Sequence, residues 1–592
     1  MTSRLRFACF LCLSLTLLAA TGPELLAVPY ASGVRNTAGQ NWQFVLNEAA
    51  DTVTISRDGG NEITLNAAAA GRYDFDMTGF TTFDIKVEKS SAAGWFELSS
   101  QSNAFTKYER PSGLAINTDP NSPYFGTVYV ANGRTTATGH ASGSRMMGDG
   151  VYSLTADLMG VDLSTGLSTW TVPDPDDTTQ ARAPSWDVID GNSSGANSVF
   201  RISLDDGGNV IAGDWSDENG GIKYASPDLT SGGLVLQGEQ GPTYGYLDPG
   251  APLDGSVSPF VHGSIRGVPN VTGTVGVDLV VRAMDEDLNR NPTGLLNGTY
   301  PNTSLPDTGP DGFPTDGNHV WKWDVGAQTN SVVKPQLLID VGGSNDPNDH
   351  QLGSDTGGRP YILDLNIGVR ADAEFFPQLG QNGLWIVTQP RSNGDESGIV
   401  FVEVDETGAT DPQVLWASRQ FTIDNNLDGF PGDPEDLGDN PNSDVFRNTG
   451  SVDVSADGKT LVVHRWFVDA PDAAAPNVNP YLGRDSDYPG AIVVIPLDEN
   501  GLPDIQIDDN GTPGNGLDDS FTNLQSITTT GQASANNNHE IEYDAAGNVY
   551  ITDNISELLQ VFSPGGDSTT LFSFDGSTFS FGIVEGLPGD YN

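Results

Sequence analysis

The chain has 592 residues, 37% of them hydrophobic, which is enough to bury the core of more than one domain. Its 79 Asp and Glu residues outnumber its 27 Lys and Arg residues, giving a formal net charge of −52. A field this negative repels nucleic acids and anionic membranes, because binding either requires Lys and Arg to displace counterions. The composition therefore argues against a nucleic-acid-binding protein and favours cations as partners. A solvated acidic surface suited to a saline habitat is the simpler interpretation of the charge.

The N-terminal segment has the pattern of a signal peptide. Two arginines precede an apolar run from Phe7 to Ala20, which is shorter than the about 20 residues that a membrane-spanning helix needs. We therefore predict that residues 1–27 are a signal peptide, that the protein is secreted and that it has no membrane span. Both cysteines, Cys9 and Cys12, lie in this segment, so disulfides cannot stabilise the mature chain.

Short runs of alternating apolar and polar residues, bounded by Gly, Asp, Asn and Pro, dominate the rest of the chain and predict an all-β protein. Between residues 28 and 108 such runs recur about every ten residues, as they do in a small β-sandwich. They include "NWQFVLN", "DTVTISRDGG", "NEITLN", "GRYDFDMTGF", "TTFDIKVEKS" and "GWFELSS". With its "DGG" turn, this segment resembles the FlgD-like immunoglobulin-type domains of secreted bacterial proteins. The resemblance implies an Ig-like β-sandwich over residues 28–108.

Internal repeats begin after this segment. In each, a strand, a turn with Asp and Gly or Asn, and a second strand follow one another, as in "SVFRISLDDGGNVIAGDW", "NTGSVDVSADGKTLVVHRW" and "NHEIEYDAAGNVYITDN". A third strand follows each pair, and candidate fourth strands lie at 168–173, 233–238 and 570–575. Repeats of four antiparallel strands describe a β-propeller. We predict six blades over residues 109–585, with seven as the alternative because a long insert has room for another blade.

Two phrases carry further resemblances. The phrase "DAAGNVYITD" resembles the NHL and SMP-30/gluconolactonase-like propeller families. Lactonases of the second family use a metal site of Glu, Asn and Asp at one mouth of the central channel, but their motif cannot be matched here residue by residue. The final "GDYN" is similar to the opening of a dockerin repeat. We therefore interpret residues 586–592 as a linker or as the start of a truncated dockerin-like module.

The stretch "DNNLDGFPGDPE" matches the calcium-loop pattern D-x-[DN]-x-[DN]-G-x5-E in full. Calcium takes six to eight oxygen ligands, and alternate side chains of a tight loop supply them from one side. Prolines within the loop oppose the exiting helix of an EF-hand, so we predict a calcium loop without its helices. A solvated acidic loop is the alternative. The predicted calcium ligands are Asp424, Asn426, Asp428, Phe430 and Glu435.

Polar residues just before the proposed first strands are candidates for a site at the mouth of the propeller channel. They are Arg110, His262, Asn366, Asn448, His539 and Glu540. Histidines, a carboxylate and amides that converge there would bind a divalent metal or a sugar. The alternative is that these residues merely line a water-filled channel.

These features predict a secreted, calcium-stabilised β-propeller that acts as an extracellular binding or scaffold module, for polysaccharide or for another extracellular protein. The alternative is an extracellular metal-dependent hydrolase, lactonase or lyase with its chemistry at the channel mouth. No nucleophile motif such as G-x-S-x-G and no H-E-x-x-H motif occurs in a suitable context, so the sequence leaves open whether the protein is an enzyme.

Overall fold

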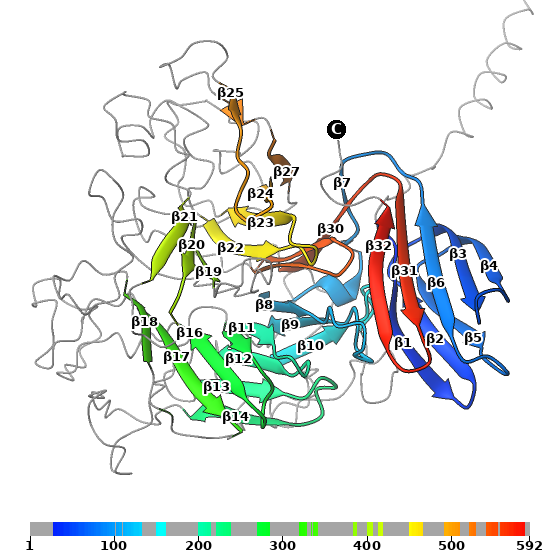
Figure 1. Ribbon diagram of the computed structural model, residues 1–592, viewed down its shortest axis with the longest axis horizontal. Coiled ribbons are helices and arrows are strands. Elements are labelled where there is room, and N and C mark those ends of the chain that lie inside the picture. The colour runs from blue at the N-terminus through cyan, green and yellow to red at the C-terminus, as the bar shows by residue number, and fades with distance from the viewer. Residues whose placement is uncertain are drawn as a thin grey trace, which may run out of the picture.

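The computed structural model describes the strands and turns of both the N-terminal segment and the repeats (Figure 1). Within the described part the only helical element is a single 3₁₀ turn, η1 (Ala104–Thr106), and every sheet ladder is antiparallel. The prediction of an all-β chain is thus confirmed. The described residues are 28–100, 102–108, 111–132, 150–160, 199–214, 221–237, 269–283, 319–327, 333, 336–340, 383–387, 399–405, 412–417, 449–465, 491–508, 520–521, 523–528, 540–553 and 557–585.

Two sheets near the N-terminus face one another across a shared apolar core, which we call the sandwich. The first has the order β1 (Ala31–Ala38), β2 (Asn41–Leu46), β5 (Gly71–Asp76). The second has the order β32 (Phe579–Glu585), β31 (Ser568–Phe574), β6 (Phe83–Lys89), β3 (Ala50–Arg57), β4 (Ile63–Ala68). Alternate residues of β6 are buried, as a strand with one solvated face requires.

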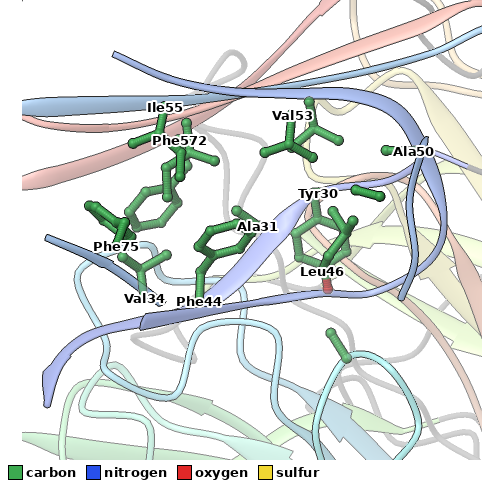
Figure 2. Packing of buried hydrophobic residues seen from close by; sticks show 14 of the residues in the cluster. Tyr30, Ala31, Val34, Phe44, Leu46, Ala50, Val53, Ile55, Phe75 and Phe572 are labelled. Carbon is green, nitrogen blue, oxygen red and sulfur yellow. The ribbon is translucent and has the colours of Figure 1, made fainter. Parts of the chain in front are cut away.

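The C-terminal strands complete the sandwich. Residues 570–575 were expected to form the outer strand of the last repeat, and this prediction is wrong, because β31 pairs with β6, placing Phe572 opposite Ile85. Figure 1 shows β31 and β32, in red, beside the blue N-terminal strands. Figure 2 shows Phe572 in the same core as Phe44 and Ile55. The alternating pattern of residues 570–575 fits a strand of the sandwich as well as an outer strand of the last repeat. Which sheet the segment joins depends on the path of the chain, which the pattern does not show.

In the described part of the chain, the repeats form six further sheets of three or four strands, numbered first to sixth in chain order. The first contains β8 (Pro111–Ile116), β9 (Val128–Asn132) and β10 (Gly150–Leu154). The second contains β11 (Val199–Leu204), β12 (Val210–Asp214), β13 (Gly221–Ala225) and β14 (Gly232–Gln237). The third contains β15 (Asn270–Thr272), β16 (Leu279–Ala283), β17 (His319–Gly326) and β18 (Gln336–Asp340).

The remaining sheets follow the same order of neighbouring strands. The fourth contains β19 (Gly383–Val387), β20 (Ile399–Glu403) and β21 (Gln413–Ala417). The fifth contains β22 (Thr449–Val454), β23 (Thr460–Arg465), β24 (Ala491–Pro496) and β27 (Gln525–Thr528), with a small ladder of β25 (Ile507–Asp508) and β26 (Ser520–Phe521) between β24 and β27. The sixth contains β28 (Ile541–Tyr543), β29 (Val549–Asp553), β30 (Leu558–Pro564) and β7 (Trp95–Glu97).

Strand β7 links the two ends of this series. It was expected within the sandwich, and that expectation is wrong, because β7 pairs with β30 through Phe96 opposite Ser563. The Trp95 indole N–H also donates a hydrogen bond of 2.9 Å to the Gln525 side chain of the fifth sheet. A strand that precedes the first sheet in the chain thus forms the outer edge of the last one.

Among the described residues, apolar cores join five pairs of neighbouring sheets, which is why strands between two cores are apolar on both faces. All five residues of β9 are buried. Its Tyr129 and Ala131 pack with Ile202 of the second sheet, and its Val128 and Val130 face the sixth. Similar cores join the second sheet to the third, the fourth to the fifth and the fifth to the sixth. The core between the sixth and first sheets brings the end of the series back to its start.

The repeated Asp-x-x-Gly-Asn turn is built by hydrogen bonds of its aspartate. In the sixth sheet Asp544 Oδ1 accepts bonds of 2.9 Å from the backbone N–H groups of Ala546 and Asn548, and Oδ2 accepts one of 2.7 Å from the Asn548 amide. Gly547 has a φ of 82°, in the left-handed region that favours glycine. Asp205 binds Gly207 and Asn209 in the same way in the second sheet.

Candidate functional site

Most of the predicted site residues lie outside the described part of the chain. This holds for Arg110, His262, Asn366, Asn448 and His539 among the channel candidates, and for the calcium loop with Asp424, Asn426, Asp428, Phe430 and Glu435. Residues 1–27 and 586–592 also lie outside it. The signal peptide, the calcium site and the dockerin-like start therefore stay predictions. Among the channel candidates, the structure places Glu540.

Glu540 lies immediately before β28 and is fully buried where three sheets meet. Its Oε2 accepts a hydrogen bond of 2.6 Å from the backbone N–H of Leu114 in the first sheet. The same oxygen lies 3.9 Å from Nη1 of Arg201 in the second sheet. Arg201 also donates a bond of 3.0 Å to the backbone carbonyl of Ser112. One carboxylate and one guanidinium thus connect the sixth, first and second sheets.

The same kind of bond occurs at the neighbouring junctions. In β22, Ser451 Oγ accepts a hydrogen bond of 2.8 Å from the backbone N–H of Ile541, and Asp453 accepts one from the backbone N–H of Tyr543. In β11, Ser203 donates from its hydroxyl to the backbone carbonyl of Pro269. The first strand of each sheet is an edge with unpaired backbone groups, and buried groups of this kind need partners. Side chains of the adjacent first strand supply them.

Sequence reasoning missed most of these junction residues. Arg201, Ser451 and Asp453 are buried, and none was a candidate. The available signal was a polar residue at every second position of an otherwise apolar strand, as in "FRIS" and "SVDVS". In a sheet with both faces buried, such a residue must face a partner rather than water.

The electrostatics of the junction favour a paired state. The side chains of Arg201 and Glu540 are 2% and 0% exposed. A charge at such depth persists only when it is paired and hydrogen-bonded, and removing one partner of a buried pair costs about 3–5 kcal/mol. The arrangement joins three sheets firmly.

The described residues contain no group of three or more His, Cys, Asp or Glu side chains arranged to hold a metal ion. Likewise, none of the helical structure in the described ranges is long and apolar enough to cross a bilayer.

Comparison with known proteins gives distant structural likenesses only. No family model and no curated protein matches the sequence. A gluconolactonase from Xanthomonas campestris aligns with 11% identity and a TM-score of 0.26, over 80% of this chain and 90% of that one. The extracellular domain of a putative one-component system from B. thetaiotaomicron aligns with 10% identity and a TM-score of 0.17, over 96% and 73%. These likenesses are too distant to carry an argument about activity, and the strand pairing stands without them.

Proposed function

We propose that this chain is a secreted β-propeller of six blades with an attached Ig-like sandwich, and that it acts as an extracellular binding or scaffold module. In this proposal the six sheets are the blades, and their first strands surround a central channel. The sandwich combines residues 28–89 with 568–585, so the propeller runs from β7 to β30. Calcium bound in the loop around Asp424 stabilises an insert that no disulfide constrains.

The observation that carries the proposal is the double junction between the last and first sheets. Strand β28 lies beside β8, where Glu540 binds the Leu114 N–H, and β7 pairs with β30 from before the first sheet. A last sheet that packs on the first, and takes its edge strand from before it, supports the closed ring of a propeller.

The contacts of the buried charged side chains favour a rigid scaffold over a catalytic role. The carboxylates of Glu540 and Asp453 and the guanidinium of Arg201 bind backbone groups or one another across sheet junctions. These groups hold the ring together and present its loops in fixed positions. Loops on a rigid frame are where binding residues usually lie.

Calcium removal tests the structural part of the proposal. After dialysis against EDTA, we expect the melting temperature to fall and to return with added CaCl2, because an ion that binds only the folded state stabilises it by mass action. The double variant Asp424→Ala/Asp428→Ala should lose the calcium-dependent part of this shift. Asp567→Ala, which removes an exposed carboxylate, should keep it. A melting temperature of the wild type indifferent to EDTA and CaCl2 would rule out the calcium site.

Ligand screening tests the functional part. We expect the purified chain to be retarded in affinity electrophoresis through gels that contain one of a set of neutral and acidic polysaccharides. The alternative, a metal-dependent hydrolase, lactonase or lyase, predicts EDTA-sensitive turnover of lactones or acidic polysaccharides instead. Such turnover would replace the scaffold proposal. Retardation without turnover would support it.

A further inference from the structure

The sandwich meets the sixth sheet along a buried contact that we call the seam. It consists of residues 28–30, 47–48 and Lys89 on the sandwich side and residues 544–550 on the other. The backbone N–H of Val28 donates a hydrogen bond of 2.7 Å to Ser563 Oγ in β30. The Tyr30 N–H donates one of 2.7 Å to the Asn47 side chain. Tyr30, labelled in Figure 2, belongs to a core that also includes Ala546.

Polar atoms without partners gather at this seam. Within the described part of the chain, three buried side-chain atoms at or beside the seam have no hydrogen-bond partner: Glu48 Oε1, Asn548 Oδ1 and Oγ of Ser568, which pairs with Lys89 across the sheet. A buried polar atom left unsatisfied costs about 1–3 kcal/mol, and more when it is charged. The seam is therefore a place where the charge state of a side chain decides how well the two sides fit.

Of the side chains at the seam, Glu48 is the one whose charge state should change the free energy of the contact most. Its Oε2 lies 3.1 Å from Nζ of Lys89, and the two side chains are only 8% and 6% exposed. Its Oε1 has no partner within the described residues. Burial raises the pKa of Glu48 to about 8, against the lowering effect of Lys89, and the carboxylate of Asp544 adds to the rise.

The other acidic groups of the seam also have raised pKa values, so their neutral forms are favoured. Burial is the main cause that raises the pKa of Asp544 to about 6, although hydrogen bonds from Asn548, from the Ala546 N–H and from Tyr30 oppose it. Burial followed by the Asp544 charge raises the pKa of Tyr30 and of Tyr550. Lys89 supplies a positive charge to this seam, and its Nζ lies against Glu48.

We propose that protonation of Glu48 keeps the seam closed and that loss of this proton opens it, so that the sandwich separates from the sixth sheet in mildly alkaline solution. A neutral carboxyl with one unpartnered oxygen bears a smaller desolvation cost on burial than a carboxylate in the same place. An ionised Glu48 would also share a low-dielectric seam with ionised Asp544, and one lysine does not neutralise both.

Hydrogen exchange followed by mass spectrometry tests this proposal on the full chain. We compare peptides that cover residues 28–34, 44–50 and 541–550 at pH 6 to 8.5, with exchange corrected for its intrinsic pH dependence. In the wild type we expect protection to fall by up to about tenfold per pH unit between pH 6 and 8, because the open seam binds one proton fewer. Peptides of the second and third sheets should keep their protection. Corrected protection that stays constant at the seam overturns the proposal.

A matched pair of variants separates the seam from general charge effects. Glu48→Gln keeps the shape of the neutral carboxyl, so we expect wild-type protection at pH 6 and no loss at pH 8.5. Glu88→Gln removes the carboxylate of the more exposed Lys86–Glu88 pair on β6, the strand that also contains Lys89. Its seam protection should change with pH as that of the wild type does. If Glu48 were instead ionised in the closed seam, Glu48→Gln would leave Lys89 buried without its anion. Seam exchange would then be faster than in the wild type already at pH 6, and the proposal would be wrong.

Discussion

Buried polar residues decide much of how this protein holds together, and Glu540 is the clearest example. Its carboxylate binds a backbone N–H of one sheet and lies beside a guanidinium of another. We expect Glu540→Ala to lower the free energy of unfolding by about 3–5 kcal/mol, because it removes the carboxylate that accepts from the Leu114 N–H and lies beside the buried Arg201 charge. Urea unfolding measures this loss. Glu540→Gln, which keeps an oxygen acceptor for Leu114, should lose less.

The same variants separate structure from function at this position. If Glu540→Ala keeps wild-type stability but abolishes binding or turnover, the residue belongs to a ligand site rather than to the sheet junction. A loss of stability that accounts for the loss of binding supports the structural role.

A second residue-scale prediction concerns Asp544. Its pKa is raised from 3.8 to about 6, mainly by burial, so the folded chain holds this proton more tightly than the unfolded chain. The stability from this group is therefore fully present below about pH 4 and is lost as the pH rises through 6, a change on the order of 3 kcal/mol. We expect Asp544→Asn to remove this part of the pH dependence in unfolding measured from pH 4 to 7. A variant with the wild-type slope would contradict the assignment.

At the scale of elements, the hairpin of β31 and β32 is the least expected feature. Phe572 is 2% exposed and packs within the sandwich core, with its ring centroid 5.7 Å from that of Phe125. We expect Phe572→Ala to destabilise the chain by about 3–5 kcal/mol, as large-to-small changes in a core do. Val584 of β32 is 58% exposed, so Val584→Ala should change stability by less than about 0.5 kcal/mol. Equal effects of the two substitutions in urea unfolding would mean that β31 does not belong to this core.

The elements also show how far the sequence predicts this fold. Alternation and turn residues locate β2, β3, β6 and most strands of the six sheets, because local pattern decides whether a segment is a strand. They misplace β7 and β31, because strand partners as far apart in the chain as Ile85 and Phe572 leave no local signal. The junction residues were missed for a related reason. A buried serine or aspartate in an apolar strand has no evident role until the edge strand of the neighbouring sheet, whose backbone it binds, is known.

At the scale of the whole molecule, the net charge of −52 is the dominant feature. Repulsion among so many carboxylates destabilises a compact chain, and salt shortens its range from about 10 Å at 0.1 M to about 3 Å at 1 M. We therefore expect the melting temperature to rise by a few degrees between 0.1 and 1 M NaCl in the presence of EDTA. The chelator separates this screening from specific calcium binding. A melting temperature that falls with NaCl would contradict it.

Because one sandwich sheet contains residues from both 50–89 and 568–585, its last strands emerge from the ribosome long after its first ones. During synthesis, the early strands must wait with an apolar face and an open edge while several hundred residues follow. A chaperone that shields this unfinished sheet would then determine the yield of active protein more than the speed of folding of any single repeat.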